Sequence, residues 1–119
     1  MKSPSFHRPE DIEGIFRQVL DVIHYALVSH YRLTEEEAKG AEEDLRTWCR
    51  RFARRGGVGQ VSSKVIRTSL LSAACQYGRS FQLWKLGDAS ADPELTATLA
   101  RRPDDLAADL DREFRRDRS

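Results

Sequence analysis

The chain has 119 residues and a formal net charge of +1, and 39% of its residues are hydrophobic and 33% charged. This length and composition are typical of a single soluble domain that buries its own core, and they exclude a small fold that depends on disulfides. No apolar run approaches the roughly 20 residues that a membrane-spanning helix requires, and the first residues carry no secretion signal, so we expect a cytoplasmic protein without membrane contact.

The first predicted element is a helix over residues 9–32. Pro9 suits a first helical position, and Glu10 and Asp11 complement the positive end of the helix dipole. Apolar residues then recur at steps of three and four, which places them on one buried stripe. The stripe consists of Ile12, Ile15, Phe16, Val19, Ile23, Ala26 and Leu27.

A second helix is expected to start after Thr34. Glu37 follows Thr34 by three positions, and this spacing is that of a capping box, in which the two residues satisfy each other's backbone N–H groups. Gly56-Gly57 predicts the end of the helix. The predicted core-facing positions are Ala38, Ala41, Leu45, Trp48 and Phe52.

A third helix is predicted from about Ser62-Ser63 to Leu86-Gly87. Leu71 and Cys75 lie almost opposite its main apolar stripe, so we expect this helix to be central, with neighbours on two sides. Small residues, Gly78 among them, would let those neighbours approach closely. The main stripe consists of Ile66, Leu70, Ala73, Tyr77, Phe81 and Trp84.

Two short helices are predicted to follow, one starting at Pro93 and one at Pro103. No alternating β-pattern of useful length interrupts this series. The sequence therefore predicts an all-α fold, a compact bundle of four to five helices in a single domain. Residues 9–87 would form the main bundle and residues 88–119 a helical extension at the carboxyl end.

Charge is sorted along the chain. Residues 46–87 hold nine Lys or Arg and no Asp or Glu, whereas both flanking segments carry more acidic than basic residues. A local positive field of this kind attracts polyanions, so the segment predicts a nucleic-acid-binding face. A solvated face that matches the helix dipole is the alternative explanation. The candidate binding residues are Arg46, Arg50, Arg54, Lys64, Arg67, Arg79 and Lys85.

The same segment contains four aromatic side chains, Trp48, Tyr77, Phe81 and Trp84. Aromatic faces can stack on unpaired bases, but at helical spacing such residues usually pack in a core. Trp84 is the best candidate for stacking because it lies near a helix end. Candidates for hydrogen bonds to the nucleic-acid backbone or to bases are Gln60, Ser62, Ser63, Thr68 and Gln82.

Signals for catalysis are weak. The three histidines do not share a face at metal-ligand spacing, and Cys49 and Cys75 form no CxxC pair, so we expect no metal, no cofactor and two reduced, buried thiols. A nucleophilic cysteine is the least favoured reading. We therefore expect a protein that is not an enzyme.

The stretch Ala41-Glu42-Glu43-Asp44-Leu45, which leads into Trp48, resembles the Ala-Glu-Asp-Leu stretch of region 2 of sigma-70-type RNA polymerase sigma factors. The order of segments over residues 12–86 is also similar. In that family the Asp-Leu helix docks on the clamp helices of polymerase, and the next helix opens the −10 promoter element and reads it as single-stranded DNA. The resemblance implies a polymerase contact at Asp44 and Leu45.

Two functional hypotheses follow. The first is a non-enzymatic nucleic-acid-binding module, a sigma-like transcription protein that contacts DNA or RNA and RNA polymerase. The second is a protein–protein interaction module or a small helical subunit of a larger assembly. In the second hypothesis the basic middle of one chain complements the acidic ends of another, so that the protein forms a homo-oligomer.

Overall fold

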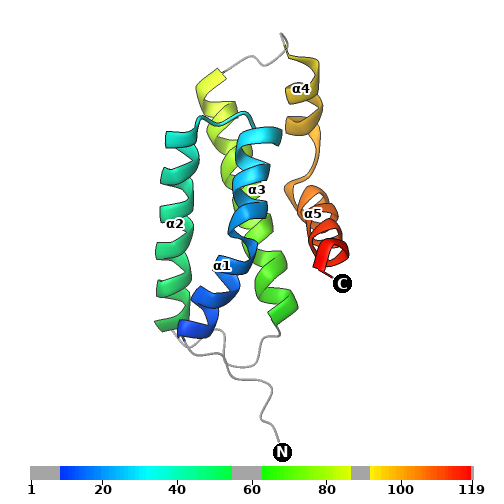
Figure 1. Cartoon of the computed structure of the whole chain (residues 1–119). Coiled ribbons are helices and arrows are strands. Elements are labelled where there is room, and N and C mark those ends of the chain that lie inside the picture. Colours follow the sequence, from blue (N-terminus) through cyan, green and yellow to red (C-terminus); the bar gives the residue numbers. More distant parts are fainter. Residues whose placement is uncertain (1–8, 55–62, 87–91, 119) are drawn as a thin grey trace, which may run out of the picture.

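The computed structural model describes residues 9–54, 63–86 and 92–118 (Figure 1). These residues form five α-helices and no strand, so the predicted all-α bundle is confirmed. The first helix continues into one turn of π-helix, Ala26–His30. Gly56-Gly57 and Gly87, which predicted helix ends, lie outside the described residues. The helices are α1 (Pro9–Tyr25), α2 (Glu35–Arg54), α3 (Ser63–Leu86), α4 (Pro93–Ala100) and α5 (Pro103–Arg118).

Helix α3 is the centre of the bundle. It packs against α1, α2 and α5, and its contact with α5 is the most extensive between any two described helices. Leu70, Leu71 and Cys75 are all fully buried although they lie on different sides of α3, which confirms the prediction of a central helix. Leu106 and Leu110 of α5 join the same core as α1, α2 and α3. The carboxyl-terminal helices therefore complete the main bundle.

The link between α1 and α2 turns sharply. In the π-helical turn, the Tyr31 N–H donates to the Ala26 carbonyl at 3.1 Å. Arg32 then adopts a φ of 60°, in the left-handed region. The predicted capping box is confirmed, because the Thr34 N–H donates to Glu37 Oε1 at 2.9 Å and the Glu37 N–H donates to Thr34 Oγ1 at 3.2 Å. Helix α2 thus starts where short-range sequence chemistry places it.

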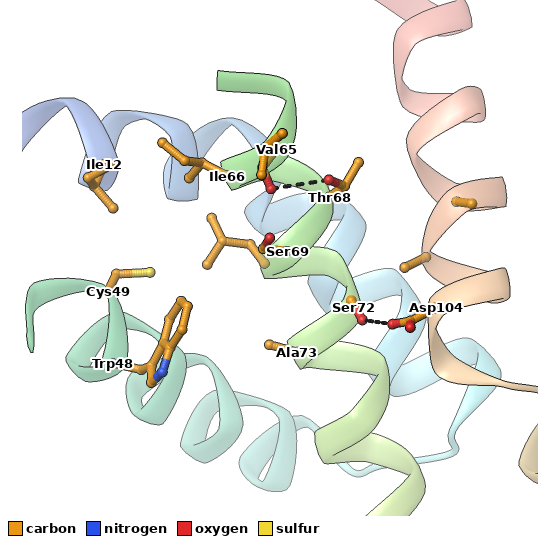
Figure 2. A pocket seen from close by; sticks show the side chains of 13 residues that line it. Ile12, Trp48, Cys49, Val65, Ile66, Thr68, Ser69, Ser72, Ala73 and Asp104 are labelled. Atoms are coloured by element: carbon orange, nitrogen blue, oxygen red, sulfur yellow. Dashed lines mark hydrogen bonds between the residues drawn. The ribbon is translucent and has the colours of Figure 1, made fainter. Parts of the chain in front are cut away.

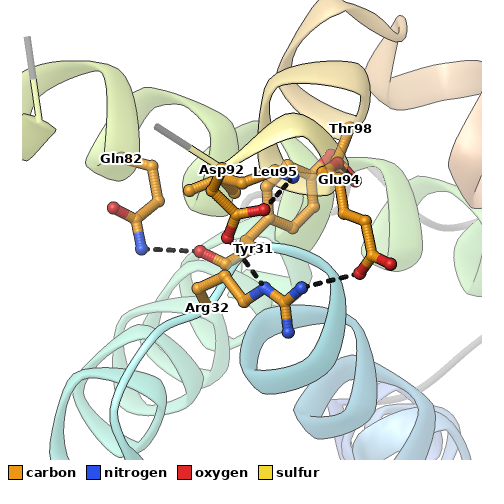
Figure 3. Close-up of polar contacts among 7 residues, drawn as sticks. All are labelled: Tyr31, Arg32, Gln82, Asp92, Glu94, Leu95 and Thr98. Carbon is orange, nitrogen blue, oxygen red and sulfur yellow. Dashed lines mark hydrogen bonds and ion pairs between the residues drawn. The ribbon is translucent and has the colours of Figure 1, made fainter. Parts of the chain in front are cut away.

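This link is held against α3 and α4 (Figure 3). Gln82 of α3 is 3% exposed, and its Nε2 donates to the Tyr31 carbonyl at 2.6 Å, so the prediction that Gln82 contacts a base is wrong. Arg32 Nη2 donates to Glu94 of α4 at 2.9 Å. The polar side chains here satisfy backbone groups at a helix end that the protein itself covers.

Candidate nucleic-acid interface

The predicted basic face is largely paired with carboxylates from other helices. Arg50 Nη2 lies 3.2 Å from Glu13 Oε1 of α1, and Arg46 Nε lies 3.8 Å from the same oxygen. Arg46 also lies 3.7 Å from Glu43, one turn earlier on α2. The prediction assumed that these cations were uncompensated because their own segment has no acidic residue. That assumption is wrong, since Glu13 reaches them from α1.

Two of the candidate residues point into the protein. Arg67 Nε donates to Asp111 Oδ1 of α5 at 2.6 Å, and both side chains are largely buried. Arg79 Nε donates to the Leu99 carbonyl, the last turn of α4, at 2.9 Å. The assignment of Arg67 and Arg79 to an outward binding face is therefore corrected: α4 and α5 cover this side of α3, which the sequence of α3 does not reveal.

Three candidate cations remain, Lys85, Lys64 and Arg54. Lys85 Nζ lies 2.8 Å from Glu37 Oε2, yet the lysine side chain stays 43% exposed. Lys64 is exposed in the first turn of α3. The side chain of Arg54 lies outside the described part of the chain. Arg50, Lys64 and Lys85 are thus the candidates whose charges reach solvent.

Two tryptophans predicted to be buried are exposed. Trp84 is 80% exposed and Trp48 is 44% exposed, so their assignment to core stripes is wrong. Tyr77 and Phe81 are half-buried, and their rings are nearly parallel, with centroids 6.4 Å apart. The Phe81 and Trp84 centroids are 6.1 Å apart. Along α3 the aromatic rings therefore form a ladder that becomes more exposed toward the end of the helix.

These rings line an open groove of about 660 Å³ between α2 and α3, which we call the aromatic groove. The Tyr77 hydroxyl donates to Asp44 Oδ2 at 3.3 Å across it. Burial, and secondarily the Asp44 carboxylate, raises the pKa of Tyr77, so this hydroxyl remains a donor near neutral pH. The groove is lined by Trp48, Ala73, Gln76, Tyr77, Ser80, Phe81 and Trp84.

A second concavity, the apolar hollow, continues from the first, since Trp48 and Ala73 line both. Its volume is about 670 Å³, and Figure 2 shows side chains from α1, α2, α3 and α5 around it. A hydrogen bond from Ser72 to Asp104 lies at its α5 side. The lining is Ile12, Trp48, Cys49, Val65, Ile66, Thr68, Ser69, Leu70, Ser72, Ala73, Asp104, Ala107 and Ala108.

The two residues that the sigma-factor resemblance marked differ in accessibility. Asp44 is exposed on α2 beside the aromatic groove. Leu45 is 5% exposed and belongs to the core, so its side chain is not presented on the surface of α2. Helical geometry explains the difference, because adjacent residues on a helix point about 100° apart.

Both cysteines are free and buried, as predicted. Burial raises the pKa of the Cys49 thiol and of the Cys75 thiol to about 11, so both stay protonated at neutral pH, whereas a nucleophile must be a thiolate. Among the described residues no group of three or more His, Cys, Asp or Glu could hold a metal ion. None of the described helices is long and apolar enough to cross a membrane.

The sequence did not predict the aromatic groove, because periodicity indicates which residues share one face of a helix and not whether another helix covers that face. The available signal was the polar residues beside the aromatic positions, Gln76 before Tyr77 and Ser80 before Phe81. Comparisons of the chain with protein-family models, with curated proteins and with solved structures give no match.

Proposed function

We propose that this protein is a non-enzymatic nucleic-acid-binding module, a sigma-like transcription protein that holds unpaired bases in the aromatic groove. The observation that carries the proposal is the 80% exposure of Trp84 at the end of a ladder of aromatic rings. A base stacked on an aromatic side chain contributes about 1–3 kcal/mol, and any base can stack because each has a π-face. A large exposed indole beside a groove is otherwise unfavourable in water.

Hydrogen-bonding groups accompany the rings. Gln76 and Ser80 are exposed on α3 within the aromatic groove and can pair with base edges. Bases in a duplex have their pairing edges and faces occupied. The proposed ligand is therefore single-stranded DNA or RNA, or an opened duplex.

Exposed cations supply the phosphate contacts in this proposal. Lys85 lies next to Trp84 in sequence, with its Nζ 5.8 Å from the Phe81 ring centre, whereas Arg50 lies beside Glu13 of α1 and Lys64 in the first turn of α3. Exposed ion pairs contribute only about 0–1 kcal/mol, so Glu13 and Glu37 compete weakly with a phosphate for Arg50 and Lys85. We expect a modest salt dependence, because Arg67 and Arg79 are occupied elsewhere.

RNA polymerase is the protein partner that the sigma-factor resemblance implies. Asp44 is available for such a contact because its carboxylate is exposed on α2. In this proposal Asp44 contacts polymerase while the neighbouring groove holds the nucleic acid.

The test compares a single-stranded oligonucleotide with its own duplex, by fluorescence anisotropy at low salt. We expect preferential binding of the single strand, and we expect Trp84→Ala to weaken it roughly tenfold, which corresponds to the loss of one stacked base. Tyr25→Ala is the matched control, because Tyr25 is 52% exposed but lines a different concavity together with Gln18 and Glu113. Equal affinity for the two forms, or no binding at low salt, contradicts the proposal.

The apolar hollow favours a second candidate function, a protein–protein interaction module. Its floor of buried Ile66, Leu70 and Ala107 offers nothing for a phosphate or a base edge to bind. Apolar concavities of this size are typical of sites that receive a side chain or a small ligand.

A further inference from the structure

Helix α3 carries Trp84 near its carboxyl end and lines the apolar hollow nearer its amino end. Ser69, which lines the hollow, precedes Trp84 by 15 positions, a separation of about 22 Å along α3. The two positions differ by only about 60° around the helix axis, so they face the same side. One face of α3 therefore presents both a protruding apolar side chain and an apolar recess.

We infer that two copies of this chain associate through this face, with their α3 helices antiparallel, and that Trp84 of each copy enters the apolar hollow of the other. A two-fold symmetric contact requires a face that is complementary to itself, and a protrusion and a recess on one helix meet that requirement. The midpoint between positions 69 and 84 falls next to Gln76, which is exposed. Gln76 of one copy would then lie opposite Gln76 of the other.

The fit is sterically reasonable. The volume of about 670 Å³ lies within the roughly 300–1,000 Å³ of pockets that enclose a small ligand, so an indole can enter. Leu83, 46% exposed, adds apolar surface beside Trp84. On either side of Gln76, three accessible positions of this face carry short side chains, Ser69, Ala73 and Ser80. Tryptophan is one of the residues most enriched among the energetic anchors of protein interfaces.

The charges favour the antiparallel arrangement. Helix α2 runs antiparallel to α3, since Glu37 pairs with Lys85 and Asp44 with Tyr77. The first turn of α2 is acidic, and exposed Arg51 lies near its carboxyl end on the side of Trp48. The two-fold arrangement sets the acidic end of one α2 near the basic end of the other.

The dimer would cover the aromatic groove and so compete with nucleic acid. Only this competition rests on the proposed function, because the dimer itself needs no nucleic acid. A second copy of the chain would therefore regulate the access of nucleic acid to the aromatic groove.

The first experiment is sedimentation equilibrium of the full chain over a concentration series without nucleic acid. We expect a reversible dimer, and we expect Trp84→Ala to raise its dissociation constant by roughly two orders of magnitude, because each dimer loses two anchors. Ser69→Phe, which fills the hollow from within the chain, should also abolish the dimer. Tyr25→Ala should leave it unchanged. A wild-type chain that stays monomeric, or a Trp84→Ala chain that dimerises normally, overturns the inference.

The second experiment tests the symmetry axis. Gln76→Cys should form an interchain disulfide on mild oxidation, whereas Gln18→Cys, exposed on α1, should not, and the native thiols are both buried. Equal cross-linking at the two positions overturns the arrangement. Ser69→Phe separates the two proposals, because it should lose the dimer and retain binding of single strands. A dimer without nucleic-acid binding contradicts the proposed function alone.

Discussion

Tyr31 and Gly78 lie in contact where the α1–α2 link meets α3. A Cβ atom on Gly78 would lie 2.7 Å from Tyr31 Cγ and 3.0 Å from Tyr31 Cβ, closer than van der Waals contact allows. Tyr31 is fully buried, and burial raises the pKa of its hydroxyl. The ring cannot move away without displacing the core, so the missing side chain at position 78 sets the distance between the two elements.

Gly78→Ala is therefore expected to destabilise the fold by about 1–3 kcal/mol through overpacking, although alanine is the better helix former. Urea denaturation followed by circular dichroism measures the change. Gly40→Ala is the matched control: Gly40 is exposed within α2 and an added Cβ there meets nothing within 4 Å, so this variant should gain up to about 1 kcal/mol. Similar changes in both variants would contradict the role of the Tyr31 contact.

At the scale of the element, the start of α2 is stabilised by a contact between residues near in sequence and by a contact with a residue far away in sequence. The pairing of Thr34 with Glu37 could be predicted from their spacing, because a capping box involves only neighbouring residues. The contact between Lys85 and Glu37 could not be predicted in this way, since Lys85 comes from the far end of α3. Its hydrogen bond is the main reason why the pKa of Glu37 is lowered, followed by the hydrogen bond from the Thr34 N–H.

A depressed pKa means that the charged carboxylate stabilises the folded state. The contribution of Glu37 should be complete above its usual pKa of 4.5 and should be lost as the pH falls through the lower folded-state value. Glu37→Gln keeps an acceptor for the Thr34 N–H but removes the charge that pairs with Lys85, so it should reduce the free energy of unfolding at neutral pH by less than about 1 kcal/mol, and the difference should shrink in acid. In a chain that also carries Lys85→Met, Glu37→Gln should reduce the free energy of unfolding by less. A difference that does not change with pH would argue against the Lys85 contact.

On the scale of the whole molecule, the buried pair between Arg67 and Asp111 ties α5 to α3. Arg67→Ala removes the cation that pairs with a carboxylate whose side chain is 3% exposed, so it should destabilise the fold by about 3 kcal/mol. Arg50→Ala removes an exposed pair with Glu13 and should cost less than about 1 kcal/mol. Thermal unfolding of both variants tests this difference, and an Arg67 variant that weakens only nucleic-acid binding would restore the role expected from sequence.

The sequence by itself determined the helices, the start of α2, the central position of α3 and the membership of Leu70, Leu71 and Cys75 in the core. These features depend on chemistry between residues a few positions apart and on the 3.6-residue period. Only the tertiary structure decided which charges are neutralised and which aromatic rings stay exposed. Arg67 meets Asp111 44 positions away, and Trp84 is exposed because no described helix covers the end of α3 there; both outcomes depend on which surfaces the packed helices bring together.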